Sequence, residues 1–470
     1  MNNEEALALV EKTLSEEHLS KLQVMVFRQA WEEQSYYAIA KTSGYEVGYV
    51  KQTGSQLWQL LSQAFGEKVT KSNLQLVLKR KAKDLDRKSS VIKISNNSLP
   101  ITHYPVRIDW GDAPDVAAFY GRNEELSNLE NWIVQDGCRM VGLFGMGGIG
   151  KTSLSVKLAK QIQGEFEYVI WRSLRHGQPI AEFLTELIQS LVIPQDIKIP
   201  DNLHSQIFHL LHFLRQHRCL LVFDNIESII EPGYISGGYL PGYEGYGQLL
   251  KCLGETNHQS TILLTSREKL KEIAAIEGQF TPIRSMVLTG LSESAVQDIF
   301  RIKGDFLGSA EEWRVLVEHY GGNPFALKIV AGAIQNLFDS NIANFIECLE
   351  QDTSVFGDIR YLLASQIERL SDLEQQIMYW LSIDREPVTF SELRADFVPQ
   401  VSLADLLEVL TSLERRCLLE KVTSTLTEKP RTLFTLKPVV MDYMTNRLLE
   451  RVCTEISNKI AFRWRVSVLP

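Results

Sequence analysis

The sequence predicts a multidomain chain with an all-α helix-turn-helix domain first, then an α/β domain built on a parallel sheet, a helical domain and a winged-helix domain. Three observations support this prediction. Short apolar strands alternate with amphipathic helices through the middle of the 470 residues, which is typical of a parallel sheet covered by helices. A helix–glycine–helix pattern precedes them, and helices closed by an apolar hairpin follow them.

The N-terminal domain is predicted over residues 1–88. Residues 35–43 form a short helix that ends at Gly44, and a second helix starts near Glu46 with its apolar side chains on one face. Such a pair is typical of a helix-turn-helix. The polar stretch 89–112 has no sustained periodicity and is expected to be a linker.

The α/β domain is predicted over residues 113–290. Because parallel strands are buried on both faces, they appear as short, wholly apolar runs between helices. A glycine- and tyrosine-rich stretch, 232–247, is expected to be a flexible surface loop rather than a partner-binding patch. The expected strands are 140–144, 168–171, 219–223, 261–265 and 285–288.

Helices replace strands in the rest of the chain. Residues 291–353 are predicted to form a helical domain. Residues 354–450 add a β-hairpin, made by 418–422 and 432–436, to further helices, which indicates a winged-helix domain. A tail, 451–470, completes the sequence.

The composition is that of a globular protein from a reducing compartment. Hydrophobic residues make up 44% and charged residues 23%, both ordinary values, and the net charge is −9. The six cysteines form no C-x-x-C pair, so neither a zinc site nor a disulfide framework is expected. A polar, acidic N-terminus and the lack of an apolar run of ~20 residues argue against a signal peptide and a membrane span. We therefore expect a cytoplasmic protein.

The strongest motif is GMGGIGKT at 145–152, which fits G-x-x-x-x-G-K-[ST] at every fixed position. It lies between an apolar strand and a helix, where backbone N–H groups and the helix dipole can hold an anion. Lys151 can reach the β- and γ-phosphates, and the Thr152 hydroxyl can coordinate Mg²⁺. The predicted phosphate-binding residues are Gly145, Gly147, Gly148, Ile149, Gly150, Lys151, Thr152 and Ser153.

Two later strands end in candidate catalytic residues. Asp224 follows strand 219–223, where P-loop folds hold Mg²⁺, so Asp224 joins Thr152 as a predicted metal ligand. The next residue, Asn225, cannot take a proton from water. Glu227 could replace it, but the sequence does not fix its direction, so we expect slow hydrolysis. Arg267, at the end of strand 261–265, is predicted to contact a γ-phosphate and so to distinguish ATP from ADP.

The ordered set of Gly121-Arg122, GMGGIGKT, LLVFDN, LLTSR and GGNPFAL resembles the NB-ARC branch of STAND-type NTPases over about residues 113–450. The resemblance implies a nucleotide-binding domain, a helical ARC domain and a winged-helix domain folded over bound ADP. It places Pro324 near the adenine and Arg122 beside the base and sugar, and it makes Arg267 the sensor arginine. Leu436-Lys437-Pro438 stands where the family has Met-His-Asp, which implies a β-phosphate contact for Lys437.

The N-terminal domain resembles the helix-turn-helix of bacterial NB-ARC proteins linked to von Willebrand A and MoxR ATPase systems. Its second helix exposes glutamines, which can read adenine, but it carries few cations to attract phosphates. The basic run Lys79-Arg80-Lys81-Ala82-Lys83 could supply that attraction. Binding to a protein partner is favoured over binding to DNA.

Together these features predict a signalling switch that binds ADP or ATP with Mg²⁺. In the resting form ADP is bound and the winged helix is closed. Exchange for ATP opens the chain, permits homo-oligomerisation and presents the N-terminal domain to a protein partner. The alternative is an ATP-controlled, DNA-binding transcriptional regulator. STAND proteins carry a C-terminal sensor of repeats, and we expect it to be either truncated here or supplied by a separate protein.

Overall fold

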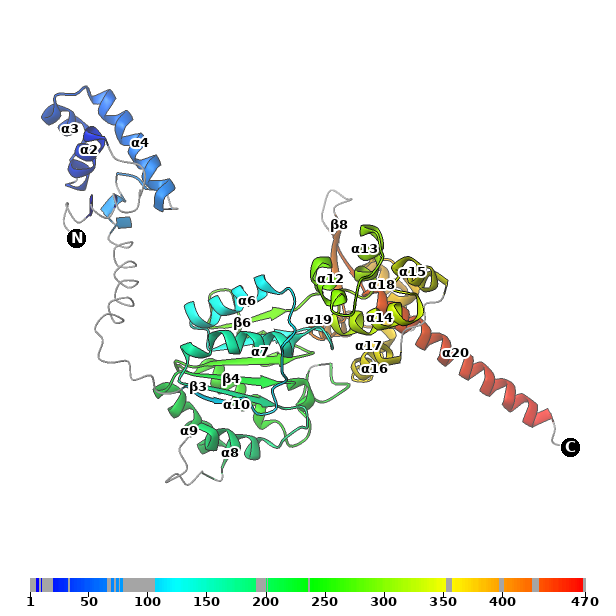
Figure 1. Cartoon of the computed structure of the whole chain (residues 1–470). Coiled ribbons are helices and arrows are strands. Elements are labelled where there is room, and N and C mark those ends of the chain that lie inside the picture. The colour runs from blue at the N-terminus through cyan, green and yellow to red at the C-terminus, as the bar shows by residue number, and fades with distance from the viewer. Residues whose placement is uncertain are drawn as a thin grey trace. The chain divides into compact units, whose positions relative to one another are not determined.

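The computed structural model describes residues 106–467 except 192–199, 201, 236, 352–356, 397–400 and 425–430. Before these it describes residues 6, 7, 10, 20–32, 34–65, 69–71, 73–75, 77 and 78. The chain forms two compact units, Met1–His103 and Tyr104–Pro470, which are described separately (Figure 1).

The first unit contains the predicted helix-turn-helix. Helices α2 (Lys21–Trp31), α3 (Tyr36–Ser43) and α4 (Val47–Phe65) surround a core that includes Phe27, Ile39 and Leu57. Gly44 ends α3 in the left-handed conformation (φ 75°), and its N–H donates to the Ala40 carbonyl. The basic run 79–83 lies outside the described residues.

The second unit begins with the predicted parallel sheet. Its strands are β1 (Arg107–Asp109), β2 (Met140–Phe144), β3 (Tyr168–Ser173), β4 (Cys219–Asp224), β5 (Thr261–Ser266) and β6 (Ile283–Val287). They run in the order β1-β3-β4-β5-β2-β6, and every pair is parallel. Strand β1 lies inside the stretch 89–112 that we expected to be a linker. The sequence does not predict this strand because three residues are too few to show a periodic pattern.

Helices cover both faces of this sheet (Figure 1). Helices α6 (Asn123–Glu130) and α7 (Lys151–Ile162) lie on one face, together with the π-helical turn η1 (Asn131–Gln135). Helices α8 (Ile180–Leu191), α9 (Leu203–Gln216), α10 (Gly245–Glu255) and α11 (Lys271–Ile276) lie on the other face. Successive strand residues point to opposite faces, so Val141 packs on the first layer and Met140 on the second. Because β4, β5 and β2 are neighbouring parallel strands, their carboxyl ends lie at the same edge of the sheet.

The remainder of the unit is helical apart from a small antiparallel sheet. Its strands are β7 (Val388–Thr389), β8 (Glu420–Ser424) and β9 (Arg431–Thr435), in the order β7-β9-β8, and the predicted hairpin is confirmed as β8 and β9. Its helices are α12 (Glu293–Arg301), α13 (Ala310–His319), α14 (Pro324–Leu337), α15 (Ile342–Gln351), α16 (Gly357–Ile367), α17 (Asp372–Asp384), α18 (Phe390–Asp396), α19 (Leu403–Arg415) and α20 (Pro438–Ser467).

This C-terminal part shares one hydrophobic core, which runs from Leu291 to Met444 and takes in Met146 of the P-loop. Packing therefore joins the P-loop to helices that follow it by more than a hundred residues. None of the described helices combines the length and apolar character that crossing a bilayer requires.

Candidate functional site

A cavity of about 400 Å³ lies at the carboxyl edge of the parallel sheet, within the size range of small-molecule sites. The P-loop forms one wall, and the residues that follow β4 and β5 form another. Helices α14 and α16 of the C-terminal part contribute a third. Lining residues include Phe119, Tyr120, Arg122, Gly147, Gly148, Ile149, Gly150, Lys151, Thr152, Ser153, Arg175, Asn225, Glu227, Arg267, Pro324, Phe325, Lys328 and Leu362.

The P-loop has the backbone that an anion cradle requires. Gly148 and Gly150 have φ of 75° and 100°, in the left-handed region that side chains other than glycine rarely adopt. A Cβ on Gly148 would lie 2.7 Å from Cβ of Phe325, so glycine also lets α14 approach the loop. Gly145 precedes the cradle with φ 153°.

Lys151 is buried at the centre of this loop. Its Nζ donates to the carbonyls of Gly145 (2.8 Å) and Met146 (3.0 Å). Burial lowers the pKa of Lys151, and the nearby Glu227 carboxylate opposes that shift. The ammonium group is thus held inside the cradle by bonds to its own loop, in a place where a phosphate would be a better partner.

The two predicted metal ligands lie together. Thr152 Oγ1 donates to Oδ1 of Asp224 at 2.9 Å, and the Thr265 hydroxyl donates to the same carboxylate. Asp224 is only 3% exposed, and burial raises the pKa of its carboxyl although the hydrogen bonds from Thr265 and Thr152 oppose that effect. A hydroxyl oxygen beside a buried carboxylate is the hard-oxygen donor set that Mg²⁺ uses in phosphate sites, so these residues fit the ion.

Asn225 and Glu227 take different parts after β4. Asn225 adopts the left-handed conformation (φ 62°), and its Nδ2 donates to Oδ2 of Asp224 at 2.8 Å. This bend starts the 3₁₀ turn η3 (Ile226–Ile229), on which Glu227 points back into the cavity. The structure thus gives Glu227 the direction that the sequence leaves open.

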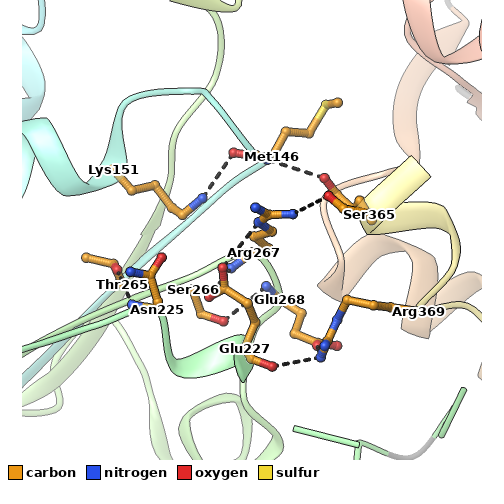
Figure 2. A network of polar contacts seen from close by, with 12 residues as sticks. Met146, Lys151, Asn225, Glu227, Thr265, Ser266, Arg267, Glu268, Ser365 and Arg369 are labelled. Atoms are coloured by element: carbon orange, nitrogen blue, oxygen red, sulfur yellow. Dashed lines mark hydrogen bonds and ion pairs between the residues drawn. The ribbon is translucent and has the colours of Figure 1, made fainter. Parts of the chain in front are cut away.

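Arg267 lines the cavity as predicted, but its guanidinium group already has partners (Figure 2). Nε lies 3.2 Å from Oε1 of Glu227, and Nη1 donates to Ser365 Oγ of α16 at 3.0 Å. Arg267 therefore connects the sheet edge to the C-terminal part of the unit.

Arg122 and Pro324 also lie at the cavity. Arg122 donates to the carbonyls of Thr289 (2.7 Å) and Ile149 (3.3 Å), so it braces the P-loop from behind. Pro324 is the first residue of α14, next to Asn323, whose Nδ2 donates to the Gly147 carbonyl at 2.9 Å.

Lys437, unlike most of the predicted residues, does not line the cavity. Its Nζ lies 3.6 Å from Oε1 of Glu420, and its side chain lies beside Gly321 on the far side of the P-loop. Glu420 is the first residue of β8.

Gln366 of α16, which no sequence motif predicts, contacts the P-loop directly. Its Oε1 accepts the Gly147 N–H at 3.3 Å, and its Nε2 donates to the Arg416 carbonyl at 3.0 Å. The side chain is buried, so it joins the cradle to the end of α19 without intervening solvent. A lone glutamine 219 residues after Gly147 leaves no local signal in the sequence.

A buried charge network reinforces the same junction (Figure 2). Glu268, directly after Arg267, pairs with Arg369 (2.7 Å) and with Arg416 (2.7 Å). Arg416 also pairs with Glu374 of α17 at 3.1 Å, and Arg369 donates to the Glu227 and Ile230 carbonyls. The network ties the ends of β4 and β5 to the C-terminal helices.

The glycine- and tyrosine-rich stretch 232–247, expected to be a flexible surface loop, is hydrogen-bonded at both sides. The Gly233 N–H donates to the Arg369 carbonyl at 2.7 Å, and Arg415 and Arg416 donate to the Ile235 and Tyr234 carbonyls. Tyr246 donates to the Gln178 carbonyl at 2.8 Å. The stretch is thus tied to the C-terminal helices and to the sheet edge, although Gly233, Tyr234 and Gly242 remain exposed on the surface.

Comparison with known proteins agrees with the predicted resemblance. Residues 122–290 match the NB-ARC domain, and residues 1–81 match the vWA-MoxR associated protein N-terminal HTH. An uncharacterized WD repeat-containing protein of Nostoc sp. is 49% identical over 356 residues, which are 74% of this chain. The chain covers only 28% of that relative's length.

More distant matches are partial. A probable disease resistance protein of Arabidopsis thaliana is 27% identical over 144 residues, which are 30% of this chain and 16% of that protein. The solved STAND protein with a tetratricopeptide repeat sensor from Pyrococcus horikoshii gives a TM-score of 0.37 at 17% identity, over 72% of this chain and 44% of that one.

Proposed function

The chain carries an NB-ARC domain and an N-terminal helix-turn-helix of the vWA-MoxR associated type, and from this premise we propose that it is a nucleotide-dependent signalling switch. It would bind ADP or ATP with Mg²⁺ and hydrolyse ATP slowly. The observation that carries the proposal is the hydrogen bond that the Gly147 N–H of the P-loop donates to Gln366 of α16. Through this bond the P-loop and the C-terminal helices form parts of one site. Occupancy of the cradle can then bias how these parts are arranged.

The cavity residues divide the task of holding a nucleotide. Glycine N–H groups of the P-loop and Lys151 would hold the phosphates, with Thr152 and Asp224 holding Mg²⁺. Bound Mg²⁺ would neutralise phosphate charge. Phe119, Tyr120 and Pro324 offer apolar surface for the base, and Arg122 would keep the loop in place through Ile149.

We propose that the conformation described here is the closed, resting form. In this reading residues 113–290 form the nucleotide-binding domain, 291–353 the ARC domain and 354–450 the winged-helix domain. Four residues of the C-terminal part support closure, because each contacts the edge of the nucleotide-binding domain directly. They are Ser365, Gln366, Arg369 and Arg416.

Exchange of ADP for ATP would open this junction, allow homo-oligomerisation and present the helix-turn-helix domain to a protein partner. Tyr37, Tyr45 and Tyr49 are exposed on α3, α4 and the turn between them. Exposed tyrosines suit a protein interface better than they suit phosphate contacts, which use cations. Among the described residues of this domain, none adds support for the DNA-binding alternative.

The test is to purify the full chain and identify the nucleotide that accompanies it by chromatography of the denatured sample. We expect about one adenine nucleotide per chain, mainly ADP, and none in Lys151→Ala. A native chain that carries no nucleotide and binds neither ADP nor ATP in titration calorimetry would overturn the proposal.

A further inference from the structure

Asn225, the residue after the proposed metal ligand Asp224, uses its side chain to bind Asp224. Asn225 Nδ2 donates to Oδ2 of Asp224 at 2.8 Å and also to the Ser173 hydroxyl at 3.3 Å. Its amide therefore faces the metal ligands and the end of β3. An amide cannot accept a proton from water in any case, so the proton acceptor for hydrolysis must be another group.

Glu227 is placed to be that group. Among the described residues that line the cavity, it carries the one carboxylate. The left-handed bend at Asn225 and the short turn η3 bring it there, two residues beyond the position that a continuing strand would offer. The negative charge of Glu227 acts on Lys151 and raises its pKa, against the effect of burial. Lysine at this P-loop position is the residue that reaches the β- and γ-phosphates.

In this conformation the Glu227 carboxylate is engaged on both oxygens. Oε1 lies 3.2 Å from Nε of Arg267, and Oε2 accepts the Arg267 backbone N–H at 3.2 Å. Arg267 in turn donates to Ser365 Oγ of α16 at 3.0 Å. The same helix covers Gly147 with Leu362, whose side chain would lie 2.9 Å from a Cβ added to that glycine. These two contacts use two of the carboxylate's ~four lone-pair sites and fix its orientation toward Arg267.

We propose that Glu227 is the general base of this site, kept idle here by Arg267 and Ser365 and freed when α16 moves away. This inference rests on the proposed function, since it assigns the hydrolytic step of that same site. The carboxylate accepts one proton from a water molecule as the water oxygen forms a bond to the γ-phosphorus. The bond from that phosphorus to the β–γ bridging oxygen breaks, its electron pair leaves with ADP, and the proton passes to inorganic phosphate. Ser365 is a positioning residue, because it acts through Arg267.

The experiment compares Glu227→Gln with the native full chain in two measurements: single-turnover hydrolysis of ATP, and the identity of the nucleotide that copurifies. Glutamine keeps the shape and can still accept from Arg267, but it cannot take the proton. We expect hydrolysis to fall by about 10²–10⁴-fold, the usual contribution of a general base. We also expect the variant to retain ATP where the native chain retains ADP. Glu277→Gln, a glutamate on the same domain outside the cavity, is the matched control and should leave both readouts unchanged.

Ser365→Ala tests the restraint and does not depend on Glu227→Gln folding. Without the Ser365 hydroxyl, Arg267 is held less firmly, and hydrolysis should rise by about tenfold, the lower end of the effect of a hydrogen bond to a charged group. Hydrolysis by Glu227→Gln at the native rate would overturn the inference. So would a native chain that binds ATP and never hydrolyses it, although the proposed switch would survive that result. A native chain that binds no nucleotide would instead overturn the proposed function itself.

Discussion

Substituting Glu268 by glutamine should weaken the junction between the nucleotide site and the C-terminal helices. Glu268 is 6% exposed and holds Arg369 and Arg416, each at 2.7 Å. Hydrogen bonds to charged groups contribute about 1.5–3 kcal/mol each, and breaking a buried ion pair costs ~3–5 kcal/mol.

The loss at this position should be smaller than the sum of two such pairs. Arg416 keeps Glu374, and Arg369 keeps the Glu227 and Ile230 carbonyls. The amide oxygen of glutamine also still accepts a hydrogen bond from one of the two arginines. We therefore expect Glu268→Gln to destabilise the closed arrangement by about 2–4 kcal/mol, which is roughly 30- to 700-fold in the equilibrium between closed and open forms.

The assay is the dissociation rate of a fluorescent ADP analogue from the full chain. If release requires opening, the rate should rise by about the same factor in Glu268→Gln. Glu277→Gln is the matched control, since Glu277 binds Lys269 and Ser285 within the same domain, and its effect should stay within about twofold. A dissociation rate for Glu268→Gln that matches the control, in a variant with a native circular dichroism spectrum, would refute the role given to this network.

Three further predictions concern the loop, the metal ligands and one buried histidine. Gly148→Ala should weaken ADP binding, as measured by calorimetry, because Gly148 has φ 75° and an added Cβ would lie 2.7 Å from Cβ of Phe325. The control is Gly137→Ala, since Gly137 also has a positive φ (63°) but no atom lies near the added Cβ. This control carries only the backbone cost of ~1–2 kcal/mol and should bind ADP normally. Asn225→Gly keeps the left-handed backbone but removes the bond to Asp224, so Mg²⁺ should be needed at higher concentration to stabilise bound nucleotide; an unchanged Mg²⁺ titration would contradict this reading. Burial lowers the pKa of His258 below its ordinary value of 6.5. As the pH falls below 6.5, the unfolded chain therefore binds a proton at this histidine before the folded chain does. The free energy of unfolding should then decrease by up to ~1.4 kcal/mol per pH unit. Urea unfolding at pH 7 and pH 5 should show a smaller difference in His258→Gln than in the native chain.

The motifs at the sheet edge could be predicted because each is local in sequence. Strand, loop and helix around Lys151 follow one another within a few residues, and the parallel strands carry Asp224 and Arg267 to the same edge. The apolar runs of 140–144 and 219–223 are strands with nearly those bounds, because buried parallel strands are wholly apolar.

What the sequence could not predict depends on contacts between distant segments. Gln366 and Ser365 lie in an ordinary helix, and nothing in their neighbourhood indicates that Gly147 and Arg267 are their partners. The direction of Glu227 depends on the left-handed backbone of Asn225, which no periodic pattern reveals. The β-phosphate contact of Lys437 depends on a family motif alone, and a motif does not show that its side chain lies near Glu420.

The central claim is that the nucleotide controls whether the C-terminal helices close on the P-loop. Small-angle X-ray scattering of the full chain, coupled to size-exclusion chromatography, tests it directly in ADP with Mg²⁺ and in a non-hydrolysable ATP analogue with Mg²⁺. We predict a compact monomer with ADP, and with the analogue an expanded chain or a larger assembly. Identical scattering and elution in the two nucleotides, with binding of both shown by calorimetry, would contradict the account.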